Sequence, residues 1–263
     1  MIDVIIPCYN AEQTLQRAVQ SALNQAKLGT LWLIDDGSTD NTFSLAKQFE
    51  NQMPEKIRVE KMPQNGGAAK ARNWGALQSN AEFIAFLDSD DAYEPNALQV
   101  ADAIFQFRPE TALVRLRLTP IDLAERYVNH PKFELGWQYM QMTCGGNVVF
   151  RRSFFLACGG FPQHELFRQF GGEDGALGIA TTNTAYVATA FNDAGVLHYC
   201  REGMHAEHLL NAVLFNQGRE DITEEAIAQA NAVTENICKQ LKQLSVCLAD
   251  ENVGIHPLNL EWQ

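Results

Sequence analysis

Short apolar runs alternate with amphipathic segments along the first hundred residues. The run DVIIP at 3–7 is rich in β-branched residues and closed by proline, which predicts a buried strand that ends there. From Ala11 the apolar residues recur every three or four positions, which predicts a helix with one buried face. The alternation continues, with strands predicted at 31–34, 57–62 and 83–87 and helices through 43–49 and 65–77. This order predicts an α/β fold with a parallel sheet, helices on both faces and ligands bound beyond the carboxyl ends of the strands.

The second half of the chain is less regular. Residues 113–118 predict a strand and residues 147–155 are expected to contain one, whereas the segment between them has no clear period. Asp221 and Glu224 resemble a capping box, and a helical apolar spacing from Ile222 to Leu248 predicts a long helix. Packing on the domain and a homodimer contact are the two roles open to this helix. No repeat or linker interrupts the chain, so we expect one main domain, residues 1–202, and a helical C-terminal extension, residues 203–263.

Charge and cysteine spacing exclude several classes of partner. The chain has 32 acidic and 20 basic residues, a formal charge of −12 that disfavours binding to nucleic acid or to anionic membranes. Its six cysteines show no metal-binding or disulfide spacing, so we expect buried free thiols in a reducing compartment. No leader and no apolar run long enough for a membrane span is recognisable. The sequence therefore predicts a cytoplasmic protein without an integral membrane segment.

Three polar clusters follow three of the predicted strands, at Pro7–Asn10, Asp35–Asp40 and Asp88–Asp91. Parallel strands bring their carboxyl ends to one edge, so the clusters should line one rim. Two carboxylates ~5 Å apart repel by roughly 3 kcal/mol at an effective dielectric of ~20, so the acids are either well solvated or bound to a cation. The turn at 65–67 opens a helix and would offer free N–H groups to an anion. Each cluster alone could be a turn with a helix cap; together they favour a site for a nucleotide diphosphate.

The second half adds two further candidates. Glu173 and Asp174 follow a glycine pair where we expect a helix to begin, so they could either complement the helix dipole or serve in the site. His198 follows a predicted strand, and a single histidine there could be structural or a metal ligand.

Taken together, these motifs resemble those of glycosyltransferase family 2, the inverting nucleotide-sugar transferases of GT-A fold. The resemblance rests on VIIPCYN, IDDGSTDNT, NGGAAKARNWGAL, FLDSDD, GGF and GGEDGAL, and it extends from Met1 to about Arg201. It implies a Rossmann-like, mostly parallel central sheet flanked by helices. It also implies a nucleotide-binding half at 1–100 and an acceptor-binding half at 101–202.

The resemblance implies a role for each motif. Asp90, the second aspartate of the DxD motif at 88–90, would bind Mn²⁺ or Mg²⁺ bridging the donor diphosphate, with His198 completing the metal site. Asp91 would lie outside the metal's ligands and be solvated. Asp174 would be the general base that takes the acceptor proton. Six residues would contact the nucleotide: Pro7, Tyr9, Asp36, Asn65, Arg72 and Asp88.

Two absences narrow the expected activity. The QxxRW motif and the membrane helices typical of processive synthases in this family are not found, so we expect a nonprocessive enzyme that adds one sugar. The donor would be a nucleotide sugar, first of all a UDP-sugar, and the acceptor a hydroxyl of a saccharide or of a lipid-linked or cell-surface glycan. Trp137 and Tyr139 could stack on a sugar ring, although core packing is the simpler role.

Three other classes of protein are alternatives to a family 2 glycosyltransferase. A phospho-receiver domain carries its paired acids after the first strand, whereas here proline ends that strand. A sugar nucleotidyltransferase needs a glycine-rich signature after its first strand, which PCYNAEQT is not. The remaining alternative is a degenerate transferase that binds nucleotide sugar without turnover; the complete DxD motif and Asp174 argue against it.

Overall fold

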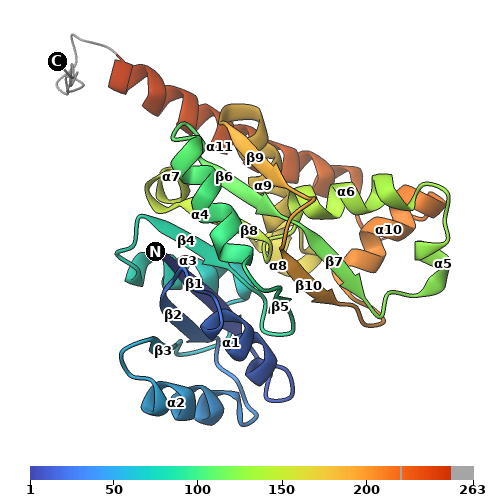
Figure 1. Ribbon diagram of the computed structural model, residues 1–263. Helices are drawn as coiled ribbons and strands as arrows, with labels where there is room; N and C mark the ends of the chain where they lie inside the picture. The colour runs from blue at the N-terminus through green and yellow to red at the C-terminus, as the bar shows by residue number, and fades with distance from the viewer. Residues whose placement is uncertain (220, 250–263) are drawn as a thin grey trace.

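The central element of the fold is a seven-stranded sheet of order β3-β2-β1-β4-β8-β6-β9 (Figure 1). The structure is a computed structural model that describes residues 1–219 and 221–249, so parts of the predicted extension, residue 220 and 250–263, lie outside the described residues. The strands are β1 (Ile2–Cys8), β2 (Leu28–Asp35), β3 (Ile57–Lys61), β4 (Phe83–Phe86), β6 (Leu113–Leu116), β8 (Val148–Arg151) and β9 (Val187–Ala190). Only β8 runs antiparallel to its neighbours in this sheet, so the mostly parallel sheet predicted from the sequence is confirmed.

A second, three-stranded sheet has the order β5-β10-β7. It consists of β5 (Ala92–Tyr93), β7 (Leu118–Ile121) and β10 (Val196–Tyr199). The single strand predicted at 113–118 is therefore wrong, because the chain leaves the main sheet at Arg117. The Arg117 carbonyl accepts a hydrogen bond from Val196 N (2.8 Å), which directs the following residues toward β10. This small sheet places β10 beside β5, the strand that follows residues 88–91.

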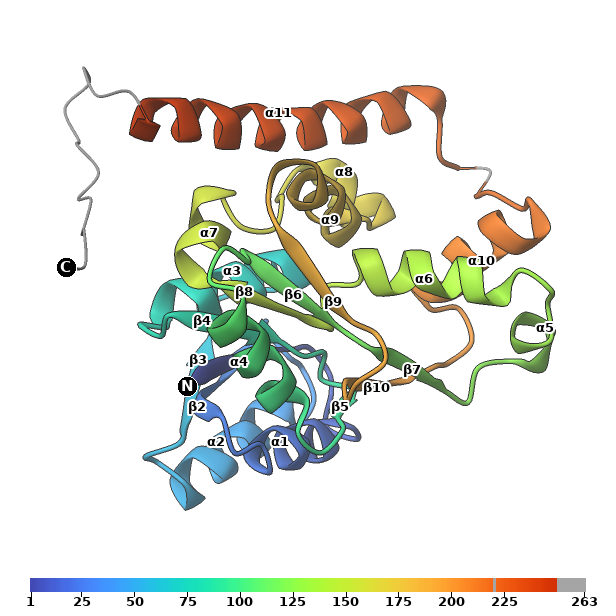
Figure 2. The same ribbon diagram turned by 45° about the horizontal axis from the view of Figure 1, so that its top comes forward.

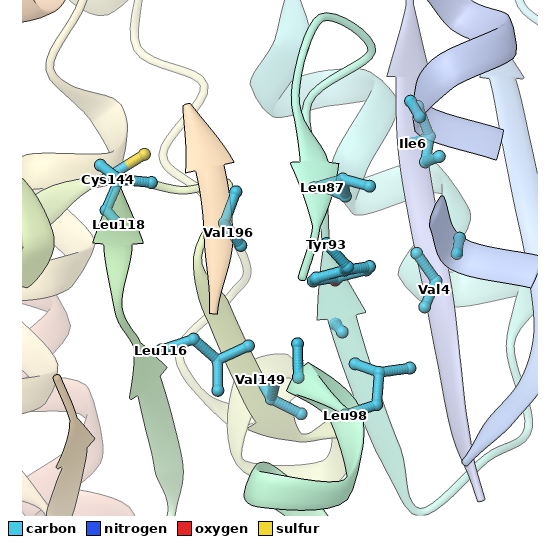
Figure 3. Close-up of a cluster of buried hydrophobic side chains, with 14 of the residues drawn as sticks. Val4, Ile6, Leu87, Tyr93, Leu98, Leu116, Leu118, Cys144, Val149 and Val196 are labelled. Carbon is cyan, nitrogen blue, oxygen red and sulfur yellow. The ribbon is translucent and has the colours of Figure 1, made fainter. Parts of the chain in front are cut away.

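Helices cover both faces of the central sheet, because successive strand residues point to opposite sides. The first face packs against α1 (Leu15–Leu23), α2 (Thr42–Gln52) and α4 (Ala97–Phe107). The second face packs against α3 (Ala68–Gln78), α7 (Arg152–Ala157) and α9 (Glu173–Thr184), and α11 (Glu224–Ala249) packs against α9. Figure 3 shows the first core from Val4 and Ile6 of β1 across to Leu116 and Leu118.

The segment without a clear period, between the strands predicted at 113–118 and 147–155, forms two helices, α5 (Glu125–Val128) and α6 (Phe133–Thr143). Trp137 is buried on α6 and donates from Nε1 to the Leu118 carbonyl (2.6 Å), so its core role is confirmed. Tyr139 is 48% exposed. The turn after α6 leads directly into β8.

The C-terminal helices pack against the main body. α10 (His205–Phe215) lies against α6, with Leu210 and Leu214 in the first core. α11 lies across α9 and α8 (Glu165–Phe170), as Figure 2 shows. The domain division at residue 202 and a homodimer contact through α11 stay predictions.

The capping box predicted at Asp221 is wrong. Thr223 Oγ1 accepts from Ala226 N (3.2 Å), whereas Asp221 is ion-paired with Arg219. The side chain of Leu248, at the end of the predicted apolar spacing, lies outside the described residues.

Other sequence predictions concern cysteines and membrane spans. Among the side chains that the structure describes, five cysteines are free; Cys8, Cys144 and Cys158 are buried, and Cys200 and Cys238 are half-buried. Within the described residues, no helix combines the length and apolar character that crossing a bilayer requires.

Candidate active site

The turn at 65–67 is tied to the end of β2 by Asp36. Both carboxylate oxygens of Asp36 accept backbone hydrogen bonds, from Gly66 N and Gly67 N (2.8 Å each). Its own N–H donates to the Cys8 carbonyl at the end of β1 (2.8 Å). Burial raises the pKa of Asp36, and the two N–H groups oppose that effect. The ends of β1 and β2 and the N-terminus of α3 are thereby brought together.

The predicted nucleotide contacts occupy this edge. Pro7 is buried in β1 beside Ile34, and Tyr9 follows it with half of its surface exposed. Asn65 is half-buried and is the first residue of the turn held by Asp36. The structure therefore brings Pro7, Tyr9, Asp36 and Asn65 to one edge of the sheet.

Arg72 links the DxD motif to the acidic pair on α9. It lies on α3 and is only 5% exposed. Its Nη2 contacts Asp88 Oδ1 (2.5 Å), and its Nη1 lies 3.7 Å from Glu173 Oε1. Burial alone would lower the pKa of Arg72, but the negative charges of Asp88 and Glu173 raise it. The guanidinium is thus a fixed positive charge between two acidic motifs.

The backbone and side chain of Asp90 are held by two arginines that sequence reasoning missed. Arg17 on α1 donates from Nη2 to the Asp90 carbonyl, and its guanidinium lies 3.5 Å from the centroid of the Tyr199 ring. Arg201 Nη2 lies 3.4 Å from Asp90 Oδ2. Burial and the neighbouring Asp88 raise the pKa of Asp90, so its carboxylate lies in a field that favours a bound cation.

Asp91 is the residue on which the sequence expectation was wrong. It was expected to be solvated, yet it is fully buried because β10 passes alongside the DxD turn. Its Oδ2 lies 2.8 Å from His198 Nδ1, and its Oδ1 accepts from Tyr199 N (3.1 Å). His198 therefore pairs with Asp91, and its Nε2 is buried without a hydrogen-bond partner among the described residues. Its role as a metal ligand stays a prediction.

A glycine turn between α6 and β8 separates Asp88 from Asp174. Gly145 N donates to Asp174 Oδ2 (3.1 Å), and Gly175 N donates to Asp174 Oδ1 (2.8 Å). A Cβ on Gly145 would lie 3.3 Å from Asp174 Cβ, and one on Gly146 would lie 2.8 Å from Asp88 Oδ2. A side chain at either position would therefore crowd one of the two acids. Sequence reasoning missed this turn, although the Gly-Gly pair before a predicted strand is the signal that could have found it.

The DxD carboxylates suit a divalent metal as oxygen donors. Mn²⁺ and Mg²⁺ take hard oxygen ligands, and Mg²⁺ is typically held by one or two carboxylates together with substrate phosphates and water. Asp88 and Asp90 could supply such oxygens. Among residues 1–219 and 221–249, however, no three His, Cys, Asp or Glu side chains are grouped closely enough to hold an ion by themselves. The residues present fit a metal that completes its ligands with a diphosphate and water.

A hollow of about 440 Å³ lies beside Arg201. It is formed between the residues after β7 and those after β10, and its lining includes Asp122, Arg126, Glu202 and Glu207. Because Arg201 also contacts Asp90, the hollow adjoins the DxD motif. Its charged lining suits a ligand with many hydroxyl groups rather than an apolar one.

Known proteins resemble this chain in sequence and in fold. The profile described as Glycosyl transferase family 2 matches residues 3–159. The chain is 38% identical over 128 residues to the Minor teichoic acid biosynthesis protein GgaA of Bacillus subtilis (strain 168), a match that covers 46% of this chain and 28% of that protein. The match thus spans little more than a quarter of the length of GgaA.

Solved structures extend the likeness to nearly the whole chain. S. aureus TarS 1–349 in complex with UDP-GlcNAc is 19% identical with a TM-score of 0.62, over 91% of this chain and 72% of that one. The mannosyltransferase PcManGT from Pyrobaculum calidifontis, in complex with GDP-Man and Mn²⁺, is 16% identical with a TM-score of 0.61, over 97% and 76%. At these identities the likeness shows the fold alone, and it confirms the predicted GT-A fold.

Proposed function

Because the chain belongs to glycosyl transferase family 2, we propose that it transfers a single sugar from a nucleotide-sugar donor to an acceptor hydroxyl, with inversion at the anomeric carbon. The observation that carries this proposal is the Gly145–Gly146 turn, which lies between Asp88 of the DxD motif and Asp174. We place the reaction in the cytoplasm, where the free cysteines would stay reduced.

The donor nucleotide would lie along the edge formed by the ends of β1, β2 and α3. Pro7, Tyr9, Asp36 and Asn65 would contact the base and ribose, with Arg72 and Asp88 beside the diphosphate. The N–H groups of Gly66 and Gly67 at the N-terminus of α3 already donate to Asp36, so the free N–H groups expected of this turn are not available to the diphosphate. A UDP-sugar is the first donor to test, since TarS binds UDP-GlcNAc on the same fold.

Asp90 would hold Mn²⁺ or Mg²⁺, with Asp88 nearby. When bound, such an ion would neutralise the charge that develops on the departing nucleoside diphosphate. PcManGT, which has the same fold, is known with GDP-Man and Mn²⁺. His198 is the further ligand expected from the resemblance, and its buried contact with Asp91 makes it the first assignment to test.

Asp174 would act as the general base. Hydrogen bonds from Gly145 N and Gly175 N hold its two carboxylate oxygens, so the side chain is oriented before a substrate binds. The acceptor hydroxyl would give its proton to Asp174 while its oxygen forms a bond to the anomeric carbon, and the bond to the nucleoside diphosphate would break on the opposite face. A general base of this kind typically contributes ~10² to 10⁴ in rate.

The acceptor would be a saccharide or a lipid-linked or cell-surface glycan. The charged hollow beside Arg201 and the exposed ring of Tyr139 on α6 offer polar and stacking contacts for such a molecule. GgaA, a relative of this chain, is a protein of minor teichoic acid biosynthesis. Glycan acceptors from cell-envelope polymers are therefore the first to try.

The test begins with donor binding. UDP-, GDP- and TDP-sugars are screened with and without Mn²⁺ for thermal stabilisation and for release of nucleotide. We expect metal-dependent stabilisation by one nucleotide class and turnover when an acceptor is added. Stabilisation by no nucleotide sugar would refute the proposal, and binding without any turnover across the acceptors would favour the degenerate binding protein.

Replacing the base separates chemistry from binding. In Asp174→Asn we expect the transfer rate to fall by ~10² to 10⁴, because no base remains to take the proton of the attacking hydroxyl. Donor affinity, measured by calorimetry, should stay close to that of the wild type. Asp193→Asn, at an exposed position, is the matched control. An equal loss of transfer and donor affinity in Asp174→Asn would mean that Asp174 is not the base.

A further inference from the structure

Arg115 is a buried cation without a carboxylate partner. It lies in β6 and is only 2% exposed. Among the described residues, no Asp or Glu oxygen lies within ion-pair distance of its guanidinium, and Nε has no hydrogen-bond partner. Its Nη1 donates to the Cys144 carbonyl (2.9 Å). Burying an unpaired charge costs desolvation free energy, so the position of Arg115 calls for an explanation beyond packing.

The surrounding backbone makes room for this side chain. A Cβ on Gly178 of α9 would lie 2.9 Å from Arg115 Nη2 and 3.0 Å from the Met142 carbonyl oxygen. Glycine at 178 therefore lets α9 approach β6 and α6 while Arg115 passes beneath it. Asp174 lies one helical turn earlier on the same helix.

Arg115 and Asp174 are hydrogen-bonded to opposite ends of the same peptide group. The carbonyl of Cys144 and the N–H of Gly145 belong to the same peptide unit. Arg115 donates to its oxygen, and its N–H donates to Asp174 Oδ2 (3.1 Å). A cation at the oxygen polarises the peptide and strengthens the N–H as a donor, because chained hydrogen bonds reinforce one another.

We propose that Arg115 is a positioning residue for Asp174, acting through the peptide between Cys144 and Gly145. The inference rests on the proposed role of Asp174 as the base. Arg115 is buried and contacts this peptide rather than the edge proposed for the donor, so its loss should alter the chemical step and leave donor binding unchanged. Burial lowers the pKa of Arg115 to about 10, which still leaves its charge intact at neutral pH.

The kinetic test compares three variants. Arg115→Met fills the space without the charge, and we expect kcat to fall about 10- to 100-fold, as for a small misplacement of a reacting group. Donor KM should stay within about twofold, and Arg115→Lys should recover much of the rate because it retains a cationic donor. Arg151→Met is the control, since Arg151 pairs with Glu82 near the start of β4, away from Asp174. A rise in donor KM equal to the fall in kcat, or no recovery in Arg115→Lys, would overturn the proposal.

A structural test needs no activity, so it separates this inference from the proposed function. Amide hydrogen exchange at Gly145 is measured by NMR in the wild type and the variants. We expect protection at Gly145 to fall about tenfold in Arg115→Met and to be retained in Arg115→Lys. Unchanged protection would overturn the inference, even if the enzyme proved active on a nucleotide sugar. If the wild type transfers no sugar, this measurement still decides whether Arg115 orders the peptide.

A further substitution provides a control in case Arg115→Met does not fold. Thermal unfolding is recorded for every variant, because Arg115→Met could fail to fold. Arg115→Gln keeps a donor without the charge and serves in that case. We expect it to lower kcat and Gly145 protection in the same direction, and wild-type values for both would overturn the inference.

Discussion

At the residue scale, Asp91 and His198 form a buried pair beside the candidate metal ligand Asp90. Burial raises the pKa of Asp91 to about 6. Burial acts to lower the pKa of His198, but its hydrogen bond to Asp91 outweighs that effect and raises it. The two side chains therefore form a hydrogen-bonded pair directly beside Asp90. Together with the hydrogen bond from Tyr199 N to Asp91, the pair ties β10 to the turn that carries the DxD motif.

Substitution of His198 tests this supporting role. His198→Phe should destabilise the protein by about 3 to 5 kcal/mol, because it leaves a buried carboxylate without its partner. The free energy of unfolding is measured in urea. Wild-type stability in His198→Phe would contradict the assignment of Asp91 as a buried, paired acid.

A second substitution distinguishes support from metal binding. His198→Asn keeps a side-chain donor for Asp91, so we expect most of the stability to be retained. Binding of Mn²⁺ in the presence of nucleotide is then measured by calorimetry. Unchanged affinity would mark His198 as a structural partner alone, whereas a loss of 10-fold or more, about 1.4 kcal/mol, would make it a metal ligand.

At the scale of elements, Glu50 joins α2 to β3. Its Oε1 accepts from Val59 N (2.9 Å), and its carboxylate pairs with Lys47. Burial acts to raise the pKa of Glu50, but the hydrogen bonds and charge of Lys47 and Val59 outweigh it, and the pKa lies below its usual value. A backbone donor on a sheet strand is thereby satisfied from a helix.

Glu50→Gln should show a pH-dependent loss of stability. The depressed pKa means that ionised Glu50 stabilises the fold above the unfolded value of 4.5, and that this contribution is lost as pH falls. We expect Glu50→Gln to be less stable by about 1 kcal/mol at pH 7 and close to the wild type near pH 3. Urea unfolding at both pH values measures this. Glu55→Gln, at an exposed position, is the control, and an equal deficit at both pH values would contradict the interpretation.

At the scale of the whole molecule, a helix outside the sequence resemblance supports the base. Ile237 and Leu241 of α11 are buried in the second core together with Leu177 and Ala180 of α9. α9 begins at Glu173 and carries Asp174. Residues from the C-terminal extension thus help to fix the helix on which the chemistry is proposed to depend.

Ile237→Asp tests this dependence. A charge forced into the contact between α11 and α9 should cost about 3 to 5 kcal/mol and lower transfer as well as the unfolding temperature. Gln240→Asp, exposed on the same helix, is the matched control and should leave both near wild-type values. Full activity in Ile237→Asp would show that α9 is held without α11. Thermal unfolding and initial rates provide the measurements.

The sequence by itself determined the elements whose pattern is local. The strands at β1 to β4 and the helices between them follow from apolar spacing over a few residues, and the polar motifs at their ends identify the family. Predictions from local patterns were wrong where residues close in sequence pair with different parts of the fold. Leu116 and Leu118 belong to different sheets, and α11 is capped by Thr223 rather than by Asp221.

Only the tertiary structure decided which side chains meet. Asp91 and His198 lie 107 positions apart, and nothing in either local pattern indicates that β10 will bury the third acid of FLDSDD. Likewise, LVRLRL reads as a strand, but whether Arg115 faces solvent or the peptide beside Asp174 depends on how β6 and α9 pack. The spacing of apolar residues predicts which face of a helix or strand is buried, because it depends on residues a few positions apart. The partner on that face depends on topology, which brings together residues from distant parts of the chain.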